Sequence, residues 1–183
     1  MPLNFTPKYT ITNSLAGALS KLEGAKERIN GLPITPAVLA SLRETARLFS
    51  THYSTMIEGN RLTEKDVESV IVKNQHFPGR ARDEKEVKGY YRALAGIEDL
   101  ARHEAPITEK HIRGIHSQVM GSESKKLGAT PYRDGQNVIK DSVSGRIVYM
   151  PPQAKDVPPL MKELVAWLAR NADAVPCPLL AAI

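Results

Sequence analysis

The sequence predicts an all-α fold that carries one β-hairpin. Apolar residues recur at three- and four-residue steps through most of the chain, which is the pattern of helices with one buried side. Glycines, prolines and capping residues separate these stretches, as they do at helix boundaries. Residues 136–150 differ, because two short runs rich in Val and Ile enclose a loop that contains glycine, which is typical of a hairpin. The expected fold is therefore a helical bundle with one two-stranded element.

Two long helices are predicted in the first third of the chain. The first spans about 14–30 and ends before Gly31. The second spans about 36–58, because a proline suits its first position and its apolar stripe continues to its end. Gly59 or Asn60 is expected to adopt the left-handed conformation that closes such a helix.

Further helices are predicted along the rest of the chain. They are a short helix opened by a capping box at Thr63–Asp66, a helix from about Asp83 to Arg102, a helix capped by Thr108 and ended by Gly121, and a helix that carries Val157 to Leu168. The apolar run 179–183 indicates the start of another helix, which the sequence leaves unfinished. We expect this run to pack against the helix that holds Leu160, Leu164 and Trp167.

The hairpin is predicted from two strands, Gln136–Lys140 and Arg146–Met150, on either side of the loop at 141–145. A two-stranded ribbon is only marginally stable by itself, so we expect it to lean on helices. Its free edge could accept an extended peptide as a third strand. A hairpin that merely decorates the surface is the alternative.

Composition and charge exclude several classes of protein. The 183 residues, 42% of them apolar, suffice for one good core, and the lone Cys177 leaves no internal disulfide. Neither a membrane-spanning apolar run nor the start of a signal peptide is present, so we expect a cytoplasmic protein. The net charge is +5, but basic and acidic residues alternate. We interpret the clusters Arg80–Arg82 and Lys125–Lys126 as solvated surface and expect no nucleic-acid binding by this region.

The histidines do not have the spacing of a metal site. His111 and His116 are one residue too far apart to share one face of a helix as a metal-binding pair. Core, cap or surface roles are expected for all five histidines. No metal site is predicted in this chain.

Glu58 is the most informative residue for function. The C-terminus of a helix is electronegative, so a carboxylate there loses stability unless a cation meets it. Arginine is the side chain best shaped to do so, because its guanidinium contacts both carboxylate oxygens. Glu58 therefore indicates half of an ion pair, with a simply solvated glutamate as the alternative.

The surrounding motifs resemble those of a known family. Ser54-x-x-x-Glu58-Gly59 matches [S/T]xxxE[G/N] and resembles the inhibitory helix of Fic proteins, in the class that carries this helix before the catalytic core. Further along, Pro131-Tyr132-Arg133, the hairpin, Val148–Pro152 and Val157–Met161 are similar to the Fic flap and the helix after it. The resemblance implies a Fic/Doc-type helical bundle. It divides the chain into an N-terminal region, 1–79, and the N-terminal part of the Fic core, 80–183, with the flap at about 136–150.

The resemblance also implies an activity. Fic enzymes typically transfer AMP from ATP, with Mg²⁺, to a hydroxyl of a target protein, through a loop and helix start of the form HPFxDGNGRxxR. That loop does not occur in this sequence, and family spacing would place it shortly after 179–183. We therefore expect no catalytic residue and no activity in these 183 residues, with the ATP and Mg²⁺ ligands lying beyond Ile183. The complete protein is expected to be an autoinhibited protein adenylyltransferase.

Roles for individual residues follow from the same resemblance. Glu58 would lie near the γ-phosphate of ATP and pair with the last Arg of the loop, while Ser54 would anchor the helix and Gly59 end it. The flap residues expected to hold a target protein are Val138, Ile139, Lys140, Val148 and Tyr149. A homodimer is possible by analogy with relatives. The alternatives are a non-catalytic Fic-like binding or regulatory module and, on charge alone, a helical DNA-binding protein.

Overall fold

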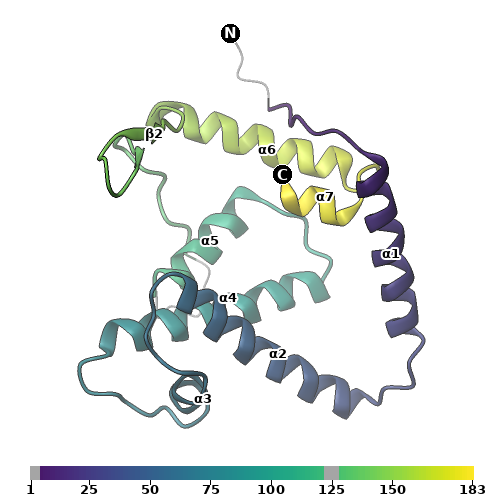
Figure 1. Ribbon diagram of the computed structural model, residues 1–183, viewed down its shortest axis with the longest axis vertical. Coiled ribbons are helices and arrows are strands. Elements are labelled where there is room, and N and C mark those ends of the chain that lie inside the picture. Colours follow the sequence, from purple (N-terminus) through teal and green to yellow (C-terminus); the bar gives the residue numbers. More distant parts are fainter. Residues whose placement is uncertain (1–4, 122–127) are drawn as a thin grey trace. The chain divides into compact units, whose positions relative to one another are not determined.

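The structure, a computed structural model, describes residues 5–121 and 128–183 (Figure 1). The Lys125–Lys126 cluster lies outside the described residues. Within the described part, the chain forms two compact units. The helical unit draws on Ile11–Ala105 and Gly114–Ala129, and the flap unit on Met1–Thr10, Pro106–Arg113 and Thr130–Ile183.

The helices expected from the sequence are present. They are α1 (Asn13–Asn30), α2 (Pro36–Ile57), α3 (Glu64–Val72), α4 (Ala81–Arg102) and α5 (Glu109–Val119). Side-chain caps fix the starts of α2 and α5: the hydroxyl of Thr35 accepts from Val38 N at 3.4 Å, and that of Thr108 accepts from His111 N at 3.1 Å. The capping box of Thr63 and Asp66 is complete, as predicted.

The core of the helical unit lies where α2, α3 and α4 pack together. It is built from small apolar side chains, with Ile71 and Phe77 packed against its edge. Its buried members are Leu62, Val67, Val70 and Val87. Because all four are near the end of α2, the loop after it or the two helices that follow, this core fixes the position of the C-terminal turn of α2.

The apolar stripe of α2 is not the side that this core buries. Leu42, Tyr53 and Met56 remain 54%, 50% and 45% exposed, whereas the buried residues of the helix are Thr51 and Thr55. Both threonines satisfy their hydroxyls locally, by donating to the carbonyl oxygen four residues earlier at 2.8 Å. Polar residues therefore tolerate burial here without any partner from another helix.

Helices α4 and α5 approach each other at glycines. A Cβ atom on Gly89 would lie 2.5 Å from the carbonyl oxygen of Gln118 and 2.9 Å from that of Val119. A Cβ on Gly96 would lie 3.3 Å from Oε1 of the same glutamine. Gln118 itself is only 8% exposed. The absence of a side chain at Gly89 is thus what allows the two backbones to come this close.

The flap unit contains the hairpin and two helices. Its elements are β1 (Ile139–Lys140), β2 (Ile147–Tyr149), the 3₁₀ helix η1 (Ala154–Asp156), α6 (Val157–Asn171) and α7 (Cys177–Ala182). The strands pair antiparallel, with Ile139 opposite Tyr149 and Lys140 opposite Ile147. Both strands are shorter than the sequence predicted. At their base Gln136 donates side-chain hydrogen bonds to the carbonyl oxygens of Pro151 (3.0 Å) and Asn137 (2.9 Å), which replace strand pairing there.

Helix α7 forms where the apolar run 179–183 was predicted to be helical. Leu180 and Ala181 line an apolar cavity of about 420 Å³ together with Leu168 and Ala169 of α6 and Ala172, which follows it. Trp167 instead contacts Phe5 edge to face, with ring centroids 6.0 Å apart. This cavity lies at the end of α6, the helix that also holds Leu160, Leu164 and Trp167, and the packing of the apolar run on that helix stays a prediction. Among the described residues no helix combines the length and apolarity needed to cross a membrane.

Candidate functional site

The C-terminal turn of α2 ends in a Schellman motif that presents Glu58. The N–H of Gly59 donates to the carbonyl oxygen of Met56 at 2.9 Å, and the N–H of Asn60 donates to that of Thr55 at 3.0 Å. Gly59 has φ +93°, the left-handed conformation, so Gly59 rather than Asn60 closes the helix. Glu58 is the C-cap residue, with φ −82° and ψ 6°. The backbone that carries its carboxylate is fixed by two hydrogen bonds.

Asn60 connects this turn to the start of α4. It is only 6% exposed, and its Nδ2 donates to the carbonyl oxygen of Asp83 at 3.0 Å and to Oε2 of Glu86 at 2.9 Å. Its Oδ1 accepts from Leu62 N at 3.1 Å. Sequence reasoning missed this role. A polar residue directly after the left-handed glycine was the available signal, because an apolar residue frequently packs back onto the helix there.

Ser54 makes the second connection between α2 and α4. The hydroxyl of Tyr90 donates to Oγ of Ser54 at 2.9 Å. Since Ser54 and Glu58 are four residues apart, they lie one helical turn from each other. The turn that carries Glu58 is therefore attached to α4 on both sides, by Ser54 before it and by Asn60 after it.

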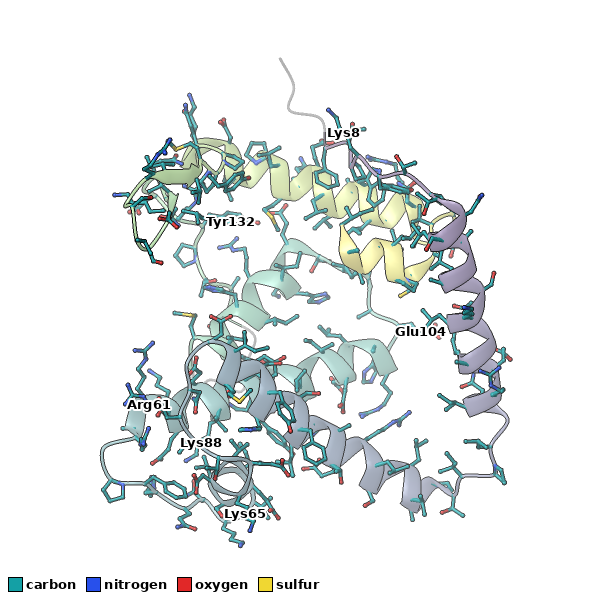
Figure 2. All side chains as sticks on the ribbon, in the orientation of Figure 1. Lys8, Arg61, Lys65, Lys88, Glu104 and Tyr132 are labelled. Carbon is teal, nitrogen blue, oxygen red and sulfur yellow. The ribbon has the colours of Figure 1, made fainter. Side chains whose placement is uncertain are left out.

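The side chain of Glu58 is exposed at a polar pocket of about 330 Å³. Three arginines line this pocket with it: Arg61, Arg80 and Arg82. Figure 2 shows Arg61 on the segment that joins α2 to α3. Arg80 is engaged by Asp83, with N and O 3.3 Å apart. Within residues 5–121 and 128–183, no ion pair or side-chain hydrogen bond engages Glu58, so the cation partner predicted for it stays a prediction.

Glu84 holds the segment between α3 and α4. It is 6% exposed, accepts a hydrogen bond from Phe77 N at 2.7 Å and lies 2.9 Å from Nδ1 of His76. The bond from the Phe77 N–H, more than the neighbouring imidazole, keeps the pKa of the Glu84 carboxyl below the ordinary value of 4.5. The carboxylate thereby satisfies a backbone donor that the loop would otherwise leave without a partner.

We predict that Glu84→Gln lowers stability at neutral pH by about 1–2 kcal/mol, because a charged acceptor is replaced by a weaker neutral one. A depressed pKa contributes stability that is present above the pKa of the unfolded chain and is lost as the pH falls through that of the folded chain. The difference between wild type and variant should therefore shrink below about pH 4.5. Urea unfolding at pH 7, 5, 4 and 3.5 measures this difference.

The matched control is Glu23→Gln, which removes an exposed carboxylate whose only recorded partner in the described part of the chain is Lys26, at 3.3 Å. It should change stability by less than about 0.5 kcal/mol at every pH. If the free energy of unfolding of Glu84→Gln stays below that of wild type by the same amount from pH 7 to 3.5, protonation of Glu84 does not contribute to the loss of stability at low pH.

The hairpin exposes apolar side chains. Ile139, Ile147, Val148 and Tyr149 are 55%, 52%, 64% and 55% exposed, while Val138 is half-buried. The loop between the strands is closed locally: Asp141 accepts from both the backbone N–H and the hydroxyl of Ser144, each at 2.6 Å. This carboxylate is occupied within its own turn. The cationic side chains of Lys140 and Arg146 have no recorded partner among the described residues.

The base of the hairpin is held by polar contacts. Arg133 donates to the carbonyl oxygens of Gly135, at 2.8 Å, and Pro152. The hydroxyl of Tyr132, labelled in Figure 2, donates to Glu109 at 2.7 Å, and the Arg113 guanidinium lies 4.8 Å from the centre of its ring. Burial and, after it, the bond to Glu109 raise the pKa of Tyr132 to about 12. Tyr132 therefore stays neutral and continues to donate at physiological pH.

The residues present do not by themselves fit an ATP–Mg group. Among the described residues, no three His, Cys, Asp or Glu side chains are grouped so that they could hold a metal ion. The glycine-rich loop that cradles phosphates in Fic enzymes is not part of the sequence.

The part of the chain that carries the hairpin is similar to a known protein family. The sequence from 106 to 183 matches the profile of the Fic/DOC family. The matched residues are similar to this family. The match includes α5, the hairpin, α6 and α7, and it leaves out α2.

Two solved structures have the same fold. A Fic domain containing signaling protein from Bacteroides thetaiotaomicron VPI-5482 aligns over 90% of this chain with a TM-score of 0.76 and 21% sequence identity. A Fic family protein from Desulfovibrio desulfuricans G20 aligns over 97% of the chain with a TM-score of 0.68 and 25% identity. The chain spans 61% and 50% of the lengths of these two proteins. The mostly helical Fic-like fold with a two-stranded antiparallel hairpin is thereby confirmed.

The family match covers some of the predicted site residues and not others. The flap, residues 136–150, lies inside the family region, whereas Ser54, Glu58 and Gly59 lie before it. The structure connects the three α2 residues to α4 as described above. Their inhibitory role, the target-binding role of Val138, Ile139, Lys140, Val148 and Tyr149, and the division near residue 80 all stay predictions.

Proposed function

We propose that this chain belongs to a Fic-type protein adenylyltransferase that is restrained by the C-terminal turn of α2. The observation that supports the proposal is the pairing of a Fic/DOC region with a fixed helix end that presents an unengaged carboxylate. A carboxylate at an electronegative helix end attracts a cation strongly. In the family, the last Arg of the HPFxDGNGRxxR signature is the cation that such a glutamate meets.

In this proposal the residues of α2 and α4 position Glu58, and Glu58 restrains the enzyme. Hydrogen bonds with α4 hold the turn of α2 in place, through Ser54 with Tyr90 and through Asn60 with Asp83 and Glu86. The backbone that carries Glu58 therefore loses little conformational entropy when Glu58 forms an ion pair. The arginine that Glu58 occupies is then withheld from the nucleotide. The AMP transfer itself, from ATP with Mg²⁺, depends on the family's signature loop.

The flap has the second role in the proposal. Its strands are short and edge-exposed, so an extended segment of a target protein would add as a further strand through backbone hydrogen bonds. Because the target hydroxyl would then be held in one orientation, the flap would raise the rate of AMP transfer by positioning. A target protein with an extended segment is the partner that this role implies.

The test of the proposal is labelling of protein by ATP that carries a labelled α-phosphate. We expect no label from residues 1–183 incubated with a lysate and Mg²⁺, because the phosphate cradle and the base are missing. A form that includes the signature loop should label itself or lysate proteins. Label from residues 1–183 would place the chemistry in this chain, and no label from the longer form, even when Glu58 is replaced, would contradict the proposed activity.

A binding or regulatory module is the second candidate function. The exposed apolar side chains of the flap favour it, because they fit peptide docking whether or not transfer follows. Labelling distinguishes the two candidates, since only the adenylyltransferase leaves a covalent mark on its partner.

A further inference from the structure

The polar pocket at the end of α2 brings charges of both signs together. Within residues 5–121 and 128–183, its charged lining consists of three carboxylates and three arginines: Glu58, Asp83, Glu86, Arg61, Arg80 and Arg82. A pocket of about 330 Å³ is roughly 9 Å wide, close to the Debye length of about 8 Å at physiological ionic strength. The charges around it are therefore incompletely screened from one another.

Half of these charges are already engaged inside the helical unit. Arg80 pairs with Asp83, with N and O 3.3 Å apart. Oε2 of Glu86 accepts a hydrogen bond from Nδ2 of Asn60 at 2.9 Å. These three side chains hold the start of α4 and its connection to α2, so they contribute little to attracting a further charge.

The other three charged side chains are exposed, and none has a recorded partner in the part of the chain that the structure describes. Glu58 is the C-cap residue of α2, and Arg82 lies in the first turn of α4. Arg61 lies on the segment that joins α2 to α3 (Figure 2). One unengaged carboxylate thus shares its pocket with two unengaged guanidinium groups.

A guanidinium beside a carboxylate competes with any other arginine for that carboxylate. It repels a second arginine that approaches, and this offsets part of the attraction from the carboxylate. It can also form the two-pronged contact with the carboxylate itself. Arg61 and Arg82 therefore lower the affinity of Glu58 for an arginine that comes from elsewhere in the protein.

We propose that Arg61 and Arg82 weaken the inhibitory ion pair of Glu58 and so set the basal activity of the enzyme. The inference rests on the proposed function, because the competing arginine is the last Arg of the family's signature. In this role the two residues act through Glu58 and take no part in the transfer itself. Without their charges Glu58 would hold the signature arginine more tightly, and basal transfer would fall.

The experiment measures the initial rate of self-labelling by ATP in the form that includes the signature loop. Arg61→Gln combined with Arg82→Gln should lower this rate about threefold or more, the size of effect that exposed charge pairs can have. Arg61→Lys combined with Arg82→Lys should restore the wild-type rate, because lysine keeps both charges. If the wild-type rate is too low for a decrease to be measured, all variants are compared in the Ser54→Ala background, which keeps Glu58.

A double-mutant cycle shows whether the effect passes through Glu58. In the Glu58→Gly background the two Arg→Gln substitutions should leave the rate unchanged, because the carboxylate on which they act is gone. The matched control is Arg28→Gln combined with Arg43→Gln, which removes two exposed arginines of α1 and α2 that do not line the pocket. This control should leave the rate unchanged with Glu58 present.

The possible results distinguish this inference from the proposed function. A rate that does not fall when the charges of Arg61 and Arg82 are removed, or that falls equally with and without Glu58, would overturn the inference. A rise on Glu58→Gly would still support autoinhibition in either case. If Glu58→Gly does not raise the rate, autoinhibition is contradicted and the role of the two arginines with it.

Discussion

Replacing Glu58 by glycine is expected to raise adenylyl transfer at least tenfold in a form of the protein that includes the signature loop. The proposed inhibition consists of an ion pair made by Glu58, and a loss of about 1.4 kcal/mol of such pairing already corresponds to tenfold. The fold should tolerate the change. Glu58 is exposed, and its side chain makes no recorded hydrogen bond in the described part of the chain. Initial rates of ATP-dependent self-labelling across ATP concentrations measure the effect.

Two further variants separate charge from helix position. Glu68→Ala removes an exposed glutamate of α3 and should leave the rate unchanged, so a rise there would indicate a general effect of net charge. Ser54→Ala should raise the rate less than Glu58→Gly, because it removes the bond from Tyr90 and leaves the carboxylate. Identical rates for wild type and Glu58→Gly at all ATP concentrations would reject autoinhibition and leave Glu58 a solvated helix end.

Gly89→Ala is expected to destabilise the protein by about 3 kcal/mol, the upper end of the range for overpacking. The added methyl would lie 2.5 Å from the carbonyl oxygen of Gln118 and 2.9 Å from that of Val119, both of them backbone atoms. Backbone cannot rotate away as a side chain does, so α4 and α5 must separate. For a chain of this size the change corresponds to a fall in Tm of roughly 6–12 °C, measured by circular dichroism.

The matched control is Gly17→Ala in α1, where nothing lies within 4 Å of the added Cβ. This substitution should stabilise by about 0.5–1 kcal/mol, because alanine loses less conformational entropy than glycine in a helix. A Gly89→Ala variant as stable as wild type would mean that α4 and α5 do not approach each other at these glycines.

The local features of this protein could be predicted from its sequence. The caps at Thr63 and Thr108 were predicted where they occur, and Gly59 is one of the two residues predicted to close α2, because each feature depends on a few neighbouring residues. The hairpin was predicted for the same reason, although its strands proved shorter. Glu58 was singled out because the charge of a helix end is a property of the helix itself.

What each helix packs against was decided by the tertiary structure. Periodicity marked Leu42, Tyr53 and Met56 as the apolar side of α2, yet α3 and α4 bury Thr51 and Thr55. A pattern of apolar residues defines a face but does not say which partner covers it. The partner depends on contacts between residues far apart in the chain.

The same distinction applies within the candidate site. The sequence alone determined that a carboxylate ends α2, one turn after Ser54. Only the tertiary structure decided that Tyr90 and Asn60 attach this turn to α4, and that Gly89 must lack a side chain. Local motifs are fixed by short-range sterics and hydrogen bonds, whereas these contacts exist only once helices separate in sequence have been brought together by burial of a shared core.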